Sequence, residues 1–130
     1  MISAKPREAV SASAEERRQV LTVAVTRAAE ILGCRQAQLG QVLGLSAPTV
    51  SRMARGEYLL DPGRKEWQLA TLFVRMFRSL DSIVGGREAA ARAWLTSHND
   101  GLNGVPAELV TDVQGLVNVV QYLDAARGRI

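Results

Sequence analysis

The sequence has few aromatic side chains and a single cysteine. Phe, Trp and Tyr make up 5% of the 130 residues, so a hydrophobic core has to be built mainly from Leu, Val, Ala and Ile. Cys34 is the only cysteine, which excludes an internal disulfide, and with the single histidine, His98, it cannot complete a structural zinc site. Because Cys34 follows a helical apolar stripe, we expect it to be a half-buried core residue. We expect neither a metal nor a cofactor.

Long hydrophobic runs are also missing. No apolar segment approaches the roughly 20 residues that a membrane helix requires. Lys5, Arg7 and Glu8 interrupt the N-terminal region, which therefore lacks the apolar centre of a signal peptide. Hydrophobic residues nevertheless make up 47% of the chain and charged residues 22%, a balance typical of a folded domain. We expect a cytoplasmic protein with no membrane partner.

The motifs of an enzyme active site are absent from the sequence. It contains no glycine-rich phosphate loop, no cluster of metal-ligating residues and no nucleophile beside a plausible base. His98 falls in a polar segment without an evident partner, which is typical of a surface histidine. A catalytic role would need an acid–base pair that we do not find. The sequence therefore predicts a binding protein and not an enzyme.

Positive charge is concentrated in the first half of the chain. The net charge is +3. Residues 1–65 hold ten Lys and Arg against six Asp and Glu, whereas residues 66–130 hold six against seven. The first half is thus the part expected to face an anionic partner such as DNA.

A helix is predicted to begin at Ser13. Ser13-Ala14-Glu15-Glu16 has the pattern of a capping box, in which Ser13 caps the helix and Glu16 reaches back to it. We therefore expect residues 1–12 to form a flexible arm. The helix is expected to end near Leu32, before Gly33. Its predicted buried stripe is Val20, Val23 or Ala24, Arg27, Ala28 and Ile31.

Two short helices, Gln36–Leu43 and Ala47–Ala54, are predicted to form a helix-turn-helix over Gln36–Met53. Such a pair crosses at a steep angle, so it needs a small residue at the crossing and a turn residue with positive φ. Gly40 and Gly44 occupy these two positions. The apolar residues expected to hold the pair together are Leu39, Leu43, Leu45, Val50 and Met53.

The second of these helices is the predicted DNA-reading element, because the second helix of the motif enters the major groove. Ser46 is its expected cap, and Pro48 fits its first turn. Arg52 is the best candidate for a guanine contact, and Gln36 and Ser46 are placed to hold phosphates. The full set of predicted DNA contacts is Gln36, Ser46, Ala47, Pro48, Thr49, Ser51, Arg52 and Arg55. The alternative is an ordinary helical hairpin with a solvated face.

The second half of the chain also reads as helical. An almost wholly apolar helix is predicted from Glu66 to Val84, followed by a helix at Arg87–Leu95. A turn-rich loop then leads to one helical turn at Pro106–Val110. Thr111 with Gln114 resembles a second capping box, which would start the last helix, ending near Arg127. We predict an all-α protein in which residues 13–65 form the DNA-binding region and residues 66–130 a second helical domain.

The combination resembles the Xre/MbcA/ParS antitoxin family. The helix-turn-helix is followed by WLTSHNDGLNGVPAELVTDVQGLVNVVQYL, which is similar to the C-terminal toxin-binding domain of that family: a Trp-Leu pair, a Leu-Gly loop, a proline-led turn and a glycine-bearing helix. Thr111-Asp112 departs from the pattern, in which a small residue would fit better after the threonine. The resemblance covers roughly residues 15–130.

The resemblance implies a partner and a mode of action. Members pair an Xre-like helix-turn-helix with a toxin-binding and dimerisation domain, and they form homodimers. The usual partner is a RES-domain toxin that degrades NAD. The antitoxin blocks the active site of the toxin and represses the operon that encodes both proteins, by binding its operator DNA.

Residues expected to contact the toxin lie in the last third of the chain. The last helix carries one apolar stripe through Val113, Leu116 and Leu123 and a second through Val119, Tyr122 and Ala126. The basic tail is expected to place Arg129 and the Ile130 carboxylate in the NAD pocket of the toxin. The predicted toxin contacts are Trp94, Leu102, Val119, Tyr122, Ala126, Arg127, Arg129 and Ile130.

Two alternatives remain open from the sequence. Both faces of the last helix would be buried if that helix served only the core of the monomer. Separately, the chain could be a stand-alone Xre-type transcriptional regulator, whose second half dimerises or senses a ligand.

Overall fold

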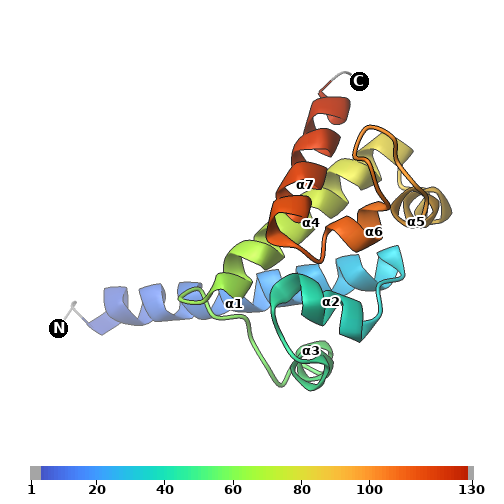
Figure 1. Ribbon diagram of the computed structural model, residues 1–130. Coiled ribbons are helices and arrows are strands. Elements are labelled where there is room, and N and C mark those ends of the chain that lie inside the picture. The colour runs from blue at the N-terminus through green and yellow to red at the C-terminus, as the bar shows by residue number, and fades with distance from the viewer. Residues whose placement is uncertain (1–3, 129–130) are drawn as a thin grey trace.

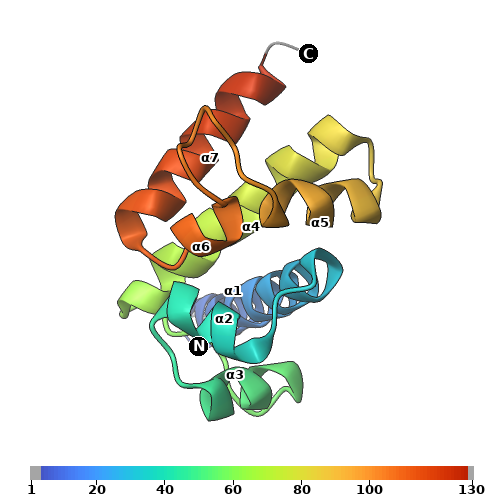
Figure 2. The same cartoon turned by 45° about the vertical axis from the view of Figure 1, so that its right-hand side comes forward.

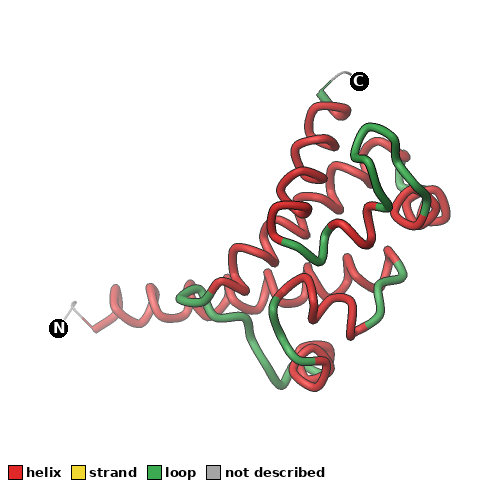
Figure 3. The backbone as a smooth tube through the Cα atoms, viewed as in Figure 1, coloured by secondary structure: helices red, strands yellow, loops and turns green. Residues whose placement is uncertain are grey.

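The chain is helical throughout the part that can be described. A computed structural model describes the backbone of residues 4–128 and the side chains of residues 13–128. Within this range it contains seven helices and no β-strand, which confirms the predicted all-α class (Figures 1 and 3). The helices are α1 (Ala4–Leu32), α2 (Gln36–Leu43), α3 (Ala47–Ala54), α4 (Lys65–Val84), α5 (Glu88–Thr96), α6 (Pro106–Leu109) and α7 (Val113–Arg127).

The first helix begins earlier than the sequence suggests. α1 starts at Ala4, so the capping box expected at Ser13 does not form, and residues 4–12 are helical where a loose arm was predicted. The segment between Pro6 and Ser13 contains no helix breaker, and a proline is tolerated in the first turn of a helix. Propensity for an uninterrupted helix therefore outweighs the local cap at Ser13.

α1 also buries a different face from the predicted one. Thr22, Val25, Ala29 and Leu32 are buried, together with the predicted Ala28. Val20 and Val23, expected in the core, are 67% and 51% exposed. Apolar residues lie on both sides of α1, so spacing alone cannot choose between them. The elements that pack on α1 decide which side is buried.

The segment between α3 and α4 is fastened along α1. Leu60 is completely buried, and its backbone N–H donates to Thr22 Oγ1 over 3.0 Å. The guanidinium of Arg18 donates to the carbonyls of Leu59 and Leu60, over 3.2 and 2.9 Å. We call residues 57–64 the strap. It connects the end of α3 to the core.

A buried carboxylate joins the strap to the start of α4. Glu66 is 4% exposed, and its Oε2 accepts hydrogen bonds from the hydroxyl of Tyr58 and the backbone N–H of Asp61. Desolvation, followed by the hydrogen bond and negative charge of Glu66, raises the pKa of Tyr58 from 10.0 to about 12. Tyr58, Asp61 and Glu66 thereby join the strap to α4 through hydrogen bonds.

α4 runs through the middle of the molecule. It packs against α1 on one side and α7 on the other, and Figure 2 shows α3 and α7 at opposite ends of the structure. Phe73, Met76 and Leu80 are at most 1% exposed. A narrow exposed strip remains on α4, formed by Gln68, Thr71, Arg75, Arg78 and Ser82. None of the described helices is long and apolar enough to span a membrane.

The second half of the chain is anchored to the first by a side chain of α5. Arg92 Nε donates to the carbonyl of Ile31 over 2.7 Å, at the C-terminal end of α1.

At the start of α7, Asp112 is the N-cap, since its carboxylate accepts from the backbone N–H of Gly115. The predicted cap at Thr111 is therefore wrong by one residue. Aspartate and threonine are both common N-caps, so the sequence alone does not decide whether Thr111 or Asp112 caps α7.

Candidate functional site

The helix-turn-helix forms because two glycines permit a close crossing. Gly44 adopts φ 72°, a left-handed conformation that ends α2 and turns the chain toward α3. A Cβ at Gly40 would lie 2.5 Å from the backbone carbonyl oxygen of Leu45. The crossing therefore excludes any side chain at that position. Val50 and Met53 of α3 are each 3% exposed and face α1 and α2, as predicted.

The outer face of α3 is open to solvent. Ser46 caps the helix by accepting from the backbone N–H of Thr49 over 3.2 Å. Thr49 and Ser51 are partly exposed, and the remaining predicted DNA contacts are exposed: Gln36, Ser46, Ala47, Pro48, Arg52 and Arg55. The structure thus leaves the predicted residues of α3 exposed or partly exposed, with Gln36 at the start of α2. Their contact with DNA remains a prediction.

Hydrogen bonds hold Arg52 along this face. The hydroxyls of Ser46 and Thr49 lie 2.9 Å apart, and Arg52 Nη2 donates to Thr49 Oγ1 over 3.1 Å. A guanidinium that is oriented in advance loses less rotamer freedom when it forms a bidentate contact. This arrangement suits the guanine contact predicted for Arg52.

Arg55 is held by an acidic neighbour that the sequence analysis did not single out. Its Nε donates to Glu57 Oε2 over 3.1 Å, and its Nη1 donates to Ser51 Oγ over 2.8 Å. To bind a DNA phosphate, the Arg55 guanidinium would have to break its ion pair with Glu57 or contact both groups at once. The sequence did contain a signal for this ion pair, because Glu57 follows Arg55 by only two residues.

Two aromatic residues, half-buried Trp94 and exposed Tyr122, lie together in the second half. The rings of Trp94 and Tyr122 are stacked, with centroids 6.3 Å apart and planes at 29°. The loop carrying Leu102 lies against them, because a Cβ at Gly101 would come within 2.8 Å of the Tyr122 ring. Tyr122 is 38% exposed. Three of the predicted toxin contacts therefore lie in one region, which joins α5, α7 and the loop between α5 and α6.

The other predicted toxin contacts lie elsewhere. Val119 is completely buried, so its assignment to an exposed face is wrong. α4 and α6 both pack against α7 and widen its buried face until it includes Val119 as well as Val120. Ala126 is half-buried. Arg127 Nη1 lies 3.5 Å from Ser79 Oγ on α4, and Arg129 and Ile130 lie outside the described residues.

A polar cluster between α4 and α7 was not predicted. Ser79 is completely buried and donates to Asp124 Oδ1 over 2.7 Å, while Asp124 also pairs with Arg75. Asp124 is 45 residues away from Ser79 in the sequence, and no local pattern connects the two. Ser79 and Asp124 fix the position of α7 on α4.

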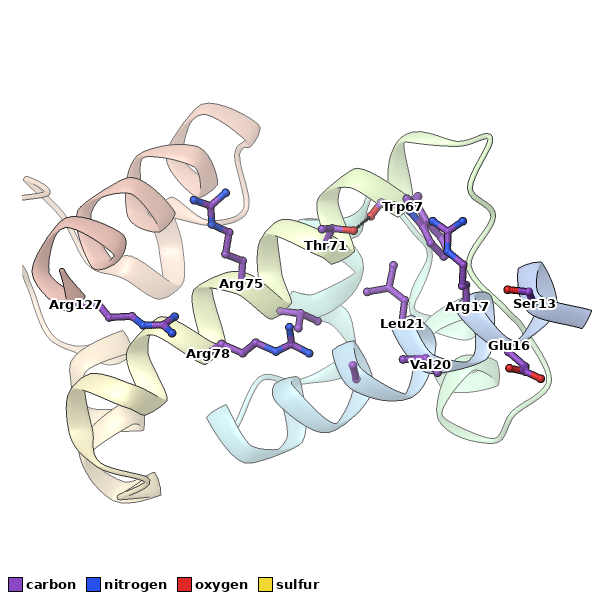
Figure 4. Close-up of a pocket in the computed structure, with 12 residues that line it drawn as sticks. Ser13, Glu16, Arg17, Val20, Leu21, Trp67, Thr71, Arg75, Arg78 and Arg127 are labelled. Atoms are coloured by element: carbon purple, nitrogen blue, oxygen red, sulfur yellow. Dashed lines mark hydrogen bonds between the residues drawn. The ribbon is translucent and has the colours of Figure 1, made fainter. Parts of the chain in front are cut away.

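An open groove of about 790 Å³ lies between α1 and α4 and reaches the end of α7 (Figure 4). Val20, Leu21 and Val74 belong to its apolar part, and Arg78 extends from α4 toward α1. The full lining is Ser13, Glu16, Arg17, Val20, Leu21, Ala24, Trp67, Thr71, Val74, Arg75, Arg78 and Arg127. Three arginines at one end give that end a positive charge.

The single cysteine and the single histidine carry no evident chemistry. Cys34 is half-buried, as predicted, and burial raises the pKa of its thiol, which disfavours the reactive thiolate. His98 is exposed, and its Nε2 lies 3.2 Å from Asp100 Oδ1, a partner that was not foreseen. Both side chains of this pair are at the surface, where such contacts contribute little stability.

Each half of the chain matches the model of a known protein family. Residues 11–75 match the antitoxin Xre-like helix-turn-helix domain, and residues 79–129 match the antitoxin Xre/MbcA/ParS C-terminal toxin-binding domain. Both families are binding domains. A search among curated proteins finds no match.

Proposed function

The chain belongs to the Xre/MbcA/ParS-type antitoxins, and from this premise we propose that it neutralises a RES-domain toxin and represses the operon encoding both. The toxin in this proposal degrades NAD, and the antitoxin acts in the cytoplasm by covering its active site. The observation that carries the proposal is the pairing, in one chain, of a helix-turn-helix at residues 11–75 with a toxin-binding domain at residues 79–129.

The toxin-binding surface in this proposal is centred on Trp94, Leu102 and Tyr122. Stacked aromatic rings with one exposed edge are frequent anchors of protein interfaces, since they bury a large area at a small cost in rotamer entropy. The tail from Arg127 onward extends the surface, and Arg129 and Ile130 enter the NAD pocket of the toxin. Val119 supports this surface from the core and does not contact the toxin.

A direct assay of NAD consumption tests neutralisation. A purified RES-domain toxin encoded beside this gene is mixed with increasing amounts of the full chain. We expect NAD loss to stop at a fixed stoichiometry. A variant without residues 127–130 tests the tail, because unchanged inhibition by that variant would remove the tail from the mechanism. Unchanged NAD loss at saturating full-length chain would contradict neutralisation itself.

Repression is tested on the promoter of the same operon. A homodimer places two recognition helices on two half-sites, so we expect protection of a region with two-fold sequence symmetry. The alternative of a stand-alone regulator shares this DNA binding but has no toxin. An operator-binding chain that leaves every co-encoded toxin active would favour that alternative.

A further inference from the structure

α1 carries an apolar patch that the rest of the chain leaves uncovered. Among the described residues the large exposed hydrophobic side chains are Val20, Val23, Val113 and Tyr122. Val20 and Val23 lie three residues apart on one helix and are the most exposed adjacent pair, at 67% and 51%. Neighbouring β-branched side chains in water on a helix that is buried elsewhere indicate an interface.

Charged residues flank this patch on the same face of α1. At roughly 100° per residue, Glu16, Val20, Val23 and Arg27 fall within an arc of about 60°. We call these four residues the outer face of α1. It points away from the buried face through Thr22, Val25 and Ala29. No ion pair with Glu16 or Arg27 is found among residues 13–128, so both charges are available to a partner.

We propose that the outer face of α1 packs antiparallel against the outer face of a second copy, across a two-fold axis midway between Val20 and Val23. The order along the helix is Glu16, Val20, Val23, Arg27, with steps of four, three and four residues. Reversing the direction of the second helix places Val20 opposite Val23 of the second copy and Glu16 opposite Arg27. The pattern is symmetric in size and opposite in charge, as a self-complementary interface requires.

Other arrangements of this face fit less well. A parallel pair would place Glu16 against Glu16 and Arg27 against Arg27, with like charges opposed at both ends. A strongly acidic partner would leave Glu16 facing negative charge. The outer face has one charge of each sign, and its own reversed copy complements both.

The neighbouring groove extends the surface available to a second copy. Leu21, Ala24 and Trp67 lie beside the outer face in the groove between α1 and α4 (Figure 4). The stretch of α1 from residue 13 to residue 30 is about 27 Å long at 1.5 Å per residue. A stable interface needs roughly 800 Å² from each partner, more than four side chains supply. The apolar part of the groove adds to the buried area.

The inference deepens the proposed homodimer and rests on it, while toxin binding lies on a different surface. Sedimentation of the full chain measures the dimer dissociation constant without toxin or DNA. Val20→Glu and Val23→Glu are expected to raise it by at least ~10-fold, because a carboxylate would be buried in an apolar seam. Val113→Glu on α7 is the matched control, since Val113 is 59% exposed and lies outside the outer face.

Charge exchange then tests the antiparallel register. Glu16→Arg alone and Arg27→Glu alone each oppose like charges at both ends of the seam, so each variant should dimerise weakly. Mixing the two variants should restore association, because every opposed pair in the heterodimer is again of unlike sign. The double variant Glu16→Arg/Arg27→Glu should also recover.

Two results would overturn the inference. The first is a wild-type chain that remains monomeric up to its solubility limit, or a dimer that Val20→Glu and Val23→Glu leave intact. The second is a mixture of the charge variants that associates no better than each variant alone. Helical content by circular dichroism confirms that every variant is folded. None of these results bears on the NAD assay, and a dimer that forms through another surface leaves the promoter assay free to succeed.

Discussion

Two glycines mark the places where a helix lies in direct contact with the backbone of a neighbouring segment. Gly40 lets α2 approach the turn before α3, and Gly115 plays the same part in the second half. A Cβ at Gly115 would clash directly with the carbonyl of Leu109, at the end of α6. The glycine in this helix, which is part of the resemblance to the toxin-binding domain, thus has a physical reason: the start of α7 touches the backbone at the end of α6.

Gly40→Ala is expected to destabilise the protein. Alanine favours a helix over glycine by about 1 kcal/mol, but its Cβ would lie 2.5 Å from the backbone oxygen of Leu45. The backbone cannot yield as a flexible side chain would, so we expect a net loss of about 1–3 kcal/mol in the free energy of unfolding. Urea denaturation measures it. Gly128→Ala, where φ is −65°, should be neutral or slightly stabilising. Equal effects at both glycines would contradict the close crossing.

Arg52→Ala is expected to weaken binding to the operator by about 1–3 kcal/mol if the guanidinium reads a guanine. The hydrogen bond that Arg52 Nη2 donates to Thr49 Oγ1 positions this side chain on the exposed face of α3. Fluorescence anisotropy on operator and random duplexes gives both affinities. Arg78→Ala, an exposed arginine of α4, is the control and should bind like the wild type. A similar loss on both duplexes would make Arg52 a phosphate contact.

Tyr58 is expected to make stability depend on pH in the alkaline range. Its pKa is raised from 10.0 to about 12 in the folded protein, so folding favours the protonated phenol. The resulting stabilisation is complete below pH 10 and is lost as pH rises toward 12. Ultraviolet titration should show one late-ionising tyrosine, which Tyr58→Phe removes. The variant should also show a smaller alkaline loss of stability. A late transition that persists in Tyr58→Phe would assign the raised pKa to another residue.

Among the elements, the strap is held in part by one hydroxyl of α1, that of Thr22. Thr22→Val keeps the shape of the side chain but leaves the buried N–H of Leu60 without its acceptor. An unsatisfied buried donor costs about 1–3 kcal/mol, and we expect a loss of that size in chemical denaturation. Thr26→Val is the matched control, because the Thr26 hydroxyl bonds only to the carbonyl of Thr22 within α1. A loss confined to Thr26→Val, or absent from both, would contradict the role of the strap.

Local signals predicted elements well where they agreed with one another. The bounds of α2 and α3 match the prediction because the glycine turn, the Ser46 cap and the apolar spacing all point to the same ends. The start of α1 was harder to predict, since a capping pattern at Ser13 competed with a continuous run of helix-forming residues. Its buried face was also ambiguous, because the strap that covers Thr22 comes from residues about 40 positions away.

The candidate site was predictable to different degrees in its two parts. Exposure of the α3 residues follows from the geometry of the helix-turn-helix, and these residues are exposed or partly exposed, while their contact with DNA stays a prediction. The second surface depends on how α4, α6 and α7 meet. Val119 was misplaced for that reason, and the cluster of Ser79 with Asp124 was missed. Contacts between distant segments carry no local signature.

At the scale of the whole molecule, both halves share one core. α4 packs on α1 and α7 alike, and Arg92 ties α5 to the end of α1. The two family matches meet within α4, since one ends at residue 75 and the other begins at residue 79. This shared core places the proposed toxin-binding surface in a defined position relative to α3.

Growth of cells tests the central claim most directly. The RES-domain toxin that we propose as the partner is induced alone and together with the full chain. We expect arrested growth and falling NAD when the toxin is induced alone, and normal growth when both are induced. Arg52→Ala should still rescue growth, because neutralisation does not require DNA binding. Continued arrest in the presence of the folded, abundant chain would contradict its assignment as the antitoxin of that toxin.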